Sequence, residues 1–290
     1  MRSNITPMLV EQRFSFHRSL IENGVLAINP SGVPSNADSS NATSVRIAMG
    51  VAQRLLAETH DREAGQTSGA KFETIVADFV ALTFPQLQHL RPGEWTVIKL
   101  GNRSSIKASS YAQYEHLAYL DELTKENKRL SAMIGNDYMV APDIVVYRTP
   151  CSDEEINRPF CVLDQTVATR SDLRASANEG RPILHASISA KWTMRSDRAQ
   201  NSRTEALNLI RNRKGSLPHI VVVTGEPLPS RLSSIALGTG DIDCTYHIAL
   251  YELMESVKEN GSEDAWDMLM TLIDGKRLKD ISDLPLDLSV

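Results

Sequence analysis

The chain of 290 residues has few cysteines and no long apolar run, and both features limit what it can be. Its three cysteines, Cys151, Cys161 and Cys244, are odd in number and lack the spacing of a zinc site. We expect them to be reduced thiols of a cytoplasmic protein. No run of about 18 apolar residues occurs and the first residues lack the apolar core of a signal peptide, so no membrane span is expected.

Positive charge is also scarce, because 31 Lys and Arg residues face 36 Asp and Glu residues, for a net charge of −5. That balance argues against a protein that coats polyanions in general, so any nucleic-acid site has to be a local patch. One segment has the composition of such a patch. The stretch "KWTMRSDRAQNSRTEALNLIRNRKG" (191–215) holds seven basic and two acidic residues.

Several enzyme signatures are absent from the sequence. There is no G-x-x-x-x-G-K-[ST] loop for nucleotide phosphates, and "GTGD" (238–241) lacks the G-x-G-x-x-G context, which favours a simple turn. The seven histidines show no H-E-x-x-H or other ligand spacing, so no zinc site is predicted.

The apolar periodicity changes between helical and strand spacing along the chain. Helices are expected over 8–27, 43–60, 68–84, 111–135, 197–213, 246–260 and 263–275, with Ser68 as the N-cap of the third. Strands are expected over 94–101, 137–148, 181–192 and 219–225, and the Ser- and Asn-rich stretch 29–42 is expected to be a loop. This order predicts an α/β fold with a central mixed β-sheet flanked by helices, in a single domain over 1–290.

A cluster of chemically active residues is predicted at the ends of two strands. Asp143 opens an apolar strand, a position at which an aspartate is often only a turn residue. Ser189 and Lys191 end a later strand and project to the same face, because side chains alternate along a strand. If the two strands are neighbours, the three residues meet. Glu205 follows on the next helix, two turns beyond Arg198 on one face, and can reach back toward the lysine.

Two carboxylates and a lysine at the edge of a sheet suit metal-assisted hydrolysis of a phosphodiester. The carboxylates supply the hard oxygen ligands that Mg²⁺ prefers, and the metal activates a water and neutralises charge in the transition state. The lysine adds positive charge beside the phosphate. Glu73, in "KFETIVADF", is a candidate further carboxylate, with a solvated helical residue as the alternative interpretation.

The cations of the 191–215 segment gather at the expected start of a helix, which Ser196 or Asp197 would cap. A helix that enters the major groove end-on places its first side chains on the base edges. Arg195 and Arg198 could each pair with guanine and Asp197 with cytosine, which predicts a GC-rich target. The alternative is a solvated first turn in which Asp197 pairs with the two arginines.

Pro142-Asp143, Ser189-Ala190-Lys191 and Glu205 together resemble the active-site pattern of the PD-(D/E)xK nucleases. They match the branch in which serine replaces the acid before the lysine and a glutamate on the following helix takes over. The block "KWTMRSDRAQNSRTEA" resembles type II restriction endonucleases of this branch, whose sites share a CCGG core. The similarity extends over nearly the whole chain.

The resemblance implies a Mg²⁺-dependent type II restriction endonuclease, with two metal ions in each active site. It would recognise 5′-GCCGGC and cut after the first G, leaving a 5′ CCGG overhang. Asp143, Lys191 and Glu205 would be catalytic, with Ser189 and Glu73 in the same pocket. Asp143, Glu205 and Glu73 would bind the metal.

The resemblance also implies which residues contact double-stranded DNA. Arg195, Asp197 and Arg198 would read the CCGG core from the major groove, and Gln66 would contact the minor groove. Arg231 and Asp38 would read the outer G·C pair. The family further implies a homotetramer built from two primary dimers, and a cognate DNA methyltransferase in the same system.

Two other functions are compatible with the same residues. A structure-specific or repair nuclease of this fold would cut branched or damaged DNA without a sequence code. A DNA-binding regulator would use the cationic segment alone, with carboxylates that are only structural.

Overall fold

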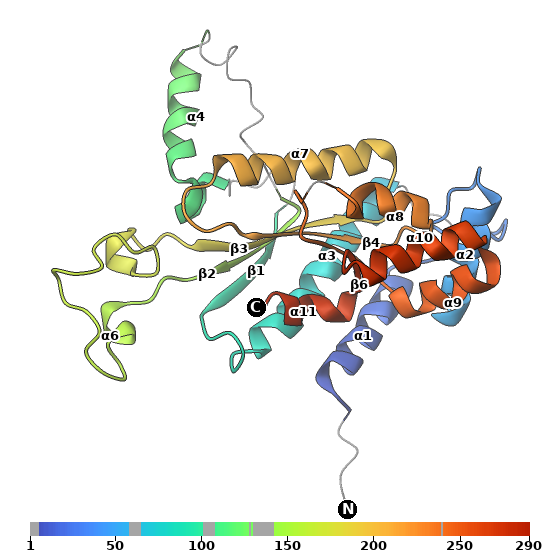
Figure 1. Ribbon diagram of the computed structural model, residues 1–290, viewed down its shortest axis with the longest axis horizontal. Helices are drawn as coiled ribbons and strands as arrows, with labels where there is room; N and C mark the ends of the chain where they lie inside the picture. The colour runs from blue at the N-terminus through green and yellow to red at the C-terminus, as the bar shows by residue number, and fades with distance from the viewer. Residues whose placement is uncertain (1–5, 58–64, 101–107, 128, 130–141, 239) are drawn as a thin grey trace, which may run out of the picture.

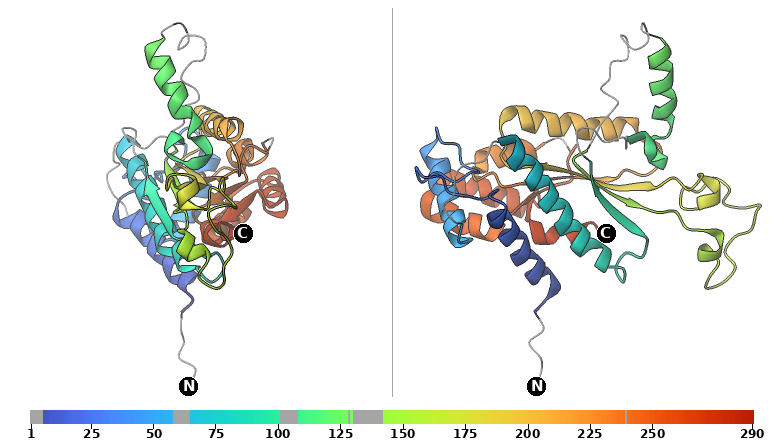
Figure 2. Two further views of the ribbon diagram at one scale, coloured as in Figure 1. Left: turned by 90° about the vertical axis from the view of Figure 1, so that its left-hand side faces the viewer. Right: turned by 180° about the vertical axis from the view of Figure 1, so that it is seen from behind.

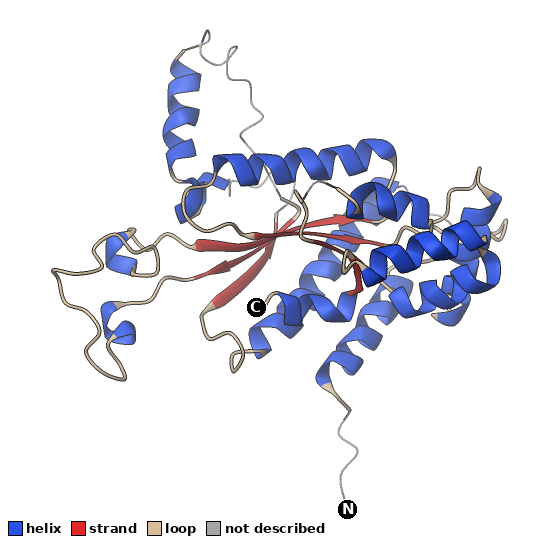
Figure 3. Cartoon of the chain, viewed as in Figure 1, coloured by secondary structure: helices blue, strands red, loops and turns tan. Residues whose placement is uncertain are grey.

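The computed structural model describes residues 6–57, 65–100, 108–127, 129, 142–238 and 240–290, with residues 65–67, 121, 196 and 197 described by backbone alone. Its centre is a six-stranded sheet in which the strands lie side by side in chain order (Figures 1 and 3). The strands are β1 (Trp95–Lys99), β2 (Ile144–Arg148), β3 (Ile183–Lys191), β4 (His219–Thr224), β5 (Cys244–His247) and β6 (Leu278–Asp280).

The sheet is mixed, and at β3 the pairing changes from antiparallel to parallel. β1, β2 and β3 pair antiparallel, whereas β3, β4, β5 and β6 pair parallel. Ile144 lies opposite Ile188, and Lys191 lies opposite Thr224. The start of β2 and the ends of β3 and β4 therefore lie side by side, at one end of these central strands.

Helices cover both faces of the sheet, so the predicted α/β fold with a central mixed sheet is confirmed (Figure 1). One long helix, α7 (Ser196–Asn212), crosses one face, while α3 (Gly65–Thr83) and α1 (Met8–Glu22) lie on the other. The remaining helices are α2 (Ala42–Arg54), α4 (His116–Glu126), α6 (Asp153–Ile156), α8 (Pro229–Ala236), α9 (Leu250–Asn260), α10 (Glu263–Asp274) and α11 (Leu284–Asp287).

Two apolar clusters fix these layers. On one side Ile188 and Val221 pack with Phe72 of α3, and on the other Val222 packs with Leu209 of α7. Successive residues of β4 enter opposite clusters, because side chains of a strand alternate between its faces. Strand β4, whose residues 220–223 are all apolar, is thus buried on both faces.

Several predicted boundaries are wrong. The strand β5 takes up the first two residues of the stretch 246–260 that was expected to be helical, because its apolar residues run directly into those of α9. β6 is too short for its periodicity to be read. α3 begins at Gly65, so Ser68 is not its N-cap. Within 111–135 the structure has a short 3₁₀ turn (Ala112–Tyr114) and then α4, and residues 130–135 fall outside the described part.

Two parts project from this body (Figure 2). One is α4, and the other is the excursion between β2 and β3, residues 149–182, which we call the arm. Several of its apolar side chains are exposed, namely Phe160, Val162, Val167 and Leu173. Among the described residues no helix is both long and apolar enough to cross a membrane.

Candidate active site and DNA-reading residues

The carboxylate of Asp143 is the centre of a hydrogen-bonded cluster at the edge of the sheet. Its Oδ2 accepts from the ammonium of Lys191 at 2.7 Å, from the backbone N–H of Ala190 at 2.9 Å and from the hydroxyl of Ser189 at 3.4 Å. The side chains of Lys191 and Asp143 are 19% and 16% exposed. The structure thus brings together the three residues that strand pairing predicted to meet, and Asp143 is more than a turn residue.

Helix α7 closes the cluster from one face of the sheet. The Ser202 and Ser189 hydroxyls lie 3.1 Å apart, which ties α7 to the end of β3. Glu205 is one helical turn further along α7. Burial raises the pKa of Glu205 to about 7 against the attraction of Lys191, and the charge of Asp143 adds to the increase. Glu205 therefore shares one electrostatic environment with the other two groups.

Glu73 approaches the same cluster from α3. Burial and the negative charge of Asp143 raise the pKa of Glu73, which the cations of Lys99 and Lys191 partly offset. Its carboxylate lies 3.5 Å from Nζ of Lys99, and 24% of its side chain is exposed. This position disagrees with the interpretation of Glu73 as a freely solvated helical residue.

Lys99 was not singled out from the sequence. It is the last residue of β1 and lies opposite Ile144, the residue after Asp143. The sequence feature that could have indicated Lys99 is a cation at the end of a predicted strand, the place where the other candidate residues also lie.

The donor set suits a magnesium ion, since Asp143, Glu205 and Glu73 supply only hard oxygen ligands. Burial is the main cause of the raised pKa values of both glutamates, and a divalent cation would offset the repulsion from Asp143 that adds to it. Within the described ranges no three His, Cys, Asp or Glu side chains stand close enough to hold one metal together. Binding by all three would therefore require their side chains to move inward.

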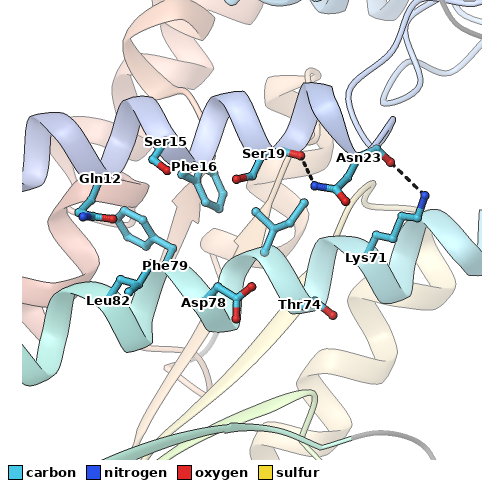
Figure 4. Close-up of a pocket in the computed structure, with 11 residues that line it drawn as sticks. Gln12, Ser15, Phe16, Ser19, Asn23, Lys71, Thr74, Asp78, Phe79 and Leu82 are labelled. Carbon is cyan, nitrogen blue, oxygen red and sulfur yellow. Dashed lines mark hydrogen bonds between the residues drawn. The ribbon is translucent and has the colours of Figure 1, made fainter.

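A separate pocket of about 210 Å³ lies between α1 and α3 (Figure 4). Its lining from α3 includes Lys71, Thr74 and Asp78, and none of the candidate catalytic residues lines it. Asn23 and Lys71 join the two helices across it, through a bond from Nζ of Lys71 to the backbone oxygen of Asn23. The candidate catalytic cluster lies elsewhere, where β2 starts and β3 ends.

The predicted reading residues of the CCGG core lie just beyond Lys191. Arg195 is exposed and is the N-cap of α7, without a side-chain capping bond, so the prediction that Ser196 or Asp197 caps this helix is wrong. Arg198 donates through Nη1 to Oγ1 of Thr193 at 3.0 Å. Asp197 lies in the first turn of α7, but its side chain is outside the described part of the chain.

The predicted reading residues of the outer base pair come from two distant segments. Arg231, in the first turn of α8, forms an ion pair with Asp38, in the 29–42 loop. Hydrogen bonds from Ser40 and Arg231 lower the pKa of Asp38 to about 2. The two side chains, distant in the sequence, therefore lie together. Gln66 lies at the start of α3, but its side chain is outside the described residues.

A mixed sheet whose edge carries the PD and SxK motifs, with a glutamate on the next helix, defines the class of PD-(D/E)xK restriction endonucleases. A sequence model of the family "NgoMIV restriction enzyme" matches residues 16–290. The chain is also 53% identical over 287 residues to the "Type II restriction enzyme NgoMIV" of Neisseria gonorrhoeae, which covers 99% of this chain and 100% of that protein. The chain belongs to the NgoMIV restriction enzyme family and is a type II site-specific deoxyribonuclease.

Proposed function

We propose that this endonuclease recognises 5′-GCCGGC in double-stranded DNA and cuts after the first G, leaving a 5′ CCGG overhang. The observation that carries the proposal is the joint between β3 and α7. Lys191, bound to Asp143, ends the strand, and Arg195 begins the helix four residues later. A scissile phosphate at the lysine would thus lie next to the base edges that the arginine reads. The 53% identity to a type II restriction enzyme supports the same assignment.

In the cleavage reaction Asp143, Glu205 and Glu73 would hold Mg²⁺, with two ions in each active site. Bound there, the metal supplies an activated water and neutralises charge on the reacting phosphate. Lys191 carries its positive charge to the same point and is oriented by Asp143, and its role is to stabilise negative charge that develops on the phosphate oxygens. Ser189 and the Ala190 N–H fix the orientation of the Asp143 carboxylate.

In recognition, Arg195 and Arg198 would pair with guanine and Asp197 with cytosine in the CCGG core. Arg231 and Asp38 would read the outer G·C pair, and Gln66 would contact the minor groove. The target is a palindrome, which fits a two-fold dimer in which each subunit reads one half-site.

The assembly proposed is a homotetramer of two primary dimers, each subunit a single endonuclease domain over 1–290. The exposed apolar side chains of the arm, such as Phe160 and Val162, support further association, because they would be buried against a second copy. One continuous sheet in chain order supports a single domain. A cognate methyltransferase would protect the same site in the host, with no stable complex required.

Digestion of a plasmid with the protein and Mg²⁺, followed by sequencing of the cut ends, tests the proposal. Discrete fragments that end in 5′ CCGG at GCCGGC sites are expected. Cuts at another sequence would refute the assigned site. Cleavage confined to branched or damaged DNA would indicate a repair nuclease, and a gel shift in Ca²⁺ without any cleavage in Mg²⁺ would indicate a regulator.

A further inference from the structure

The segment Gly225–Glu226, directly after β4, contacts three parts of the candidate DNA-reading surface. The Gly225 N–H donates to the backbone oxygen of Trp192, at 3.2 Å, in the joint between β3 and α7. Asn36, in the loop that carries Asp38, donates to the backbone oxygen of Gly225 at 2.7 Å. No side chain fits at this position, because a Cβ on Gly225 would lie 2.8 Å from Cζ3 of Trp192. The packing of the Trp192 ring against the Gly225 backbone therefore requires glycine.

The side chain of Glu226 extends these contacts to the starts of α7 and α8, the helices that carry Arg198 and Arg231. Its Oε2 accepts from the backbone N–H of Met194, the residue before Arg195, at 2.8 Å. Its Oε1 accepts from the N–H of Leu228 at 3.2 Å, and Leu228 is the N-cap of α8, which has no side-chain cap. The guanidinium of Arg231 lies 3.8 Å from Oε2. One carboxylate thus contacts the start of each helix and one of the reading arginines.

A carboxylate is costly at this position. Glu226 is fully buried, and burial raises its pKa to about 7 despite the two backbone donors and Arg231. An apolar residue here would leave both backbone N–H groups without this acceptor, which costs free energy. A glutamine would satisfy only one of the two N–H groups through its single acceptor oxygen. Only a carboxylate accepts from both while attracting the arginine, so Glu226 links the start of α7, the start of α8 and Arg231.

We propose that Glu226 is a positioning residue that fixes the start of α7 relative to Arg231, so that the CCGG core and the outer base pair are read in one register. The inference rests on the proposed function, because it uses the assigned roles of Arg195, Arg198 and Arg231. It adds a residue that would touch no base and no metal, yet would set how strictly the outer pair is discriminated.

The test compares Glu226→Gln with the matched variant Asp280→Asn. Asp280 is also fully buried and accepts from two backbone N–H groups, those of Leu250 and Ser282, and from an arginine, but it lies outside the reading surface. Binding to a GCCGGC duplex and to an ACCGGT duplex, which differs only in the outer pair, is measured in Ca²⁺ by gel shift. Glu226→Gln should lower the preference for GCCGGC about threefold, a fraction of one base contact and less than the loss expected for Arg231→Ala, and Asp280→Asn should leave it unchanged.

The route through Arg231 is tested in the Arg231→Ala background. There Glu226→Gln should cause no further loss of outer-pair preference, while the preference for CCGG over a changed core should still fall through Met194. If Glu226→Gln does not fold, Glu226→Asp keeps the charge but is too short for both N–H groups, and should show a smaller loss in the same direction. An unchanged preference in the variant that folds, or an equal loss in Asp280→Asn, would overturn the inference. Wild-type protein without preference for GCCGGC would instead refute the proposed function.

Discussion

The residues proposed for cleavage and for reading the CCGG core meet at one strand-to-helix joint, but they are held very differently. Asp143 receives three hydrogen bonds from β3, and its ion pair with Lys191 is largely buried. Arg195 is exposed, and the contacts described for Arg198 are to Thr193, a residue of the same joint. Catalysis needs groups fixed before the substrate arrives, whereas base recognition gains from side chains that can still adjust.

The reading residues differ among themselves in the same way. Arg231 is already paired with Asp38 and lies near the buried Glu226. To contact a base, Arg231 must weaken its ion pair with Asp38. The net contribution of the new contact to the free energy of binding is therefore smaller than for an unpaired arginine. The inner arginines therefore should contribute more to binding than the outer one.

Removing the cutting lysine should have the largest effect. We expect Lys191→Ala to lower the rate of cleavage at least about 10²–10³-fold, because it deletes a fixed charge beside the phosphate. Binding of GCCGGC in Ca²⁺ should remain. Lys279→Ala is the matched control, since Lys279 pairs with Asp287 at 2.6 Å away from the site. Equal cleavage by wild type and Lys191→Ala would contradict the assigned role.

Removing an inner reading arginine should affect binding next most strongly. Arg198→Ala should weaken binding to GCCGGC by about 1–3 kcal/mol and leave binding to random DNA almost unchanged. Competition gel shifts measure both. Arg211→Ala, at the exposed far end of α7, provides the control. Equal losses on the two DNAs would show that Arg198 contacts only phosphate.

The cutting residues should respond to pH near neutrality more than the reading residues do. Because the pKa of Glu205 is raised to about 7, the carboxyl holds a proton below that pH and must lose it before it can bind a cation. The Mg²⁺ concentration for half-maximal cleavage should rise roughly tenfold per pH unit below 7. Titrations of Mg²⁺ between pH 6 and 8 measure this. A requirement that does not change over that range would show that Glu205 binds no metal.

Removing the outer reading arginine should have the smallest effect. Arg231→Ala should reduce the preference for GCCGGC over ACCGGT by less than about tenfold, because the wild-type side chain gives up part of its pairing with Asp38. Competition between the two duplexes in Ca²⁺ gives the ratio. A loss larger than that of Arg198→Ala would reverse the ranking of the inner and outer residues.

Much of the sheet and the cutting cluster could be predicted from the sequence, because both depend on local periodicity. The apolar run 220–223 of β4 and the shared face of Ser189 and Lys191 need only a strand and its two faces. Pairing of two such strands then brings Asp143 to the lysine.

The missed features depend on contacts that are distant in the sequence or on elements that are too short. Strand β5 has four residues and β6 has three, fewer than a pattern of period two needs to stand out. Glu226 contacts Met194, 32 residues before it, and lies near Arg231 in a different element. Nothing within "TGEPLP" shows that its carboxylate is buried.

The position of β3, between an antiparallel and a parallel neighbour, also affects how the enzyme loses activity on unfolding. This one strand aligns Asp143 through its antiparallel neighbour and leads to Glu226 through its parallel neighbour. If β3 detaches under heat or denaturant, the chemistry and the sequence preference are lost in the same event. A damaged molecule should therefore be inert instead of indiscriminate, a safeguard for any cell whose own chromosome lies within reach of the enzyme.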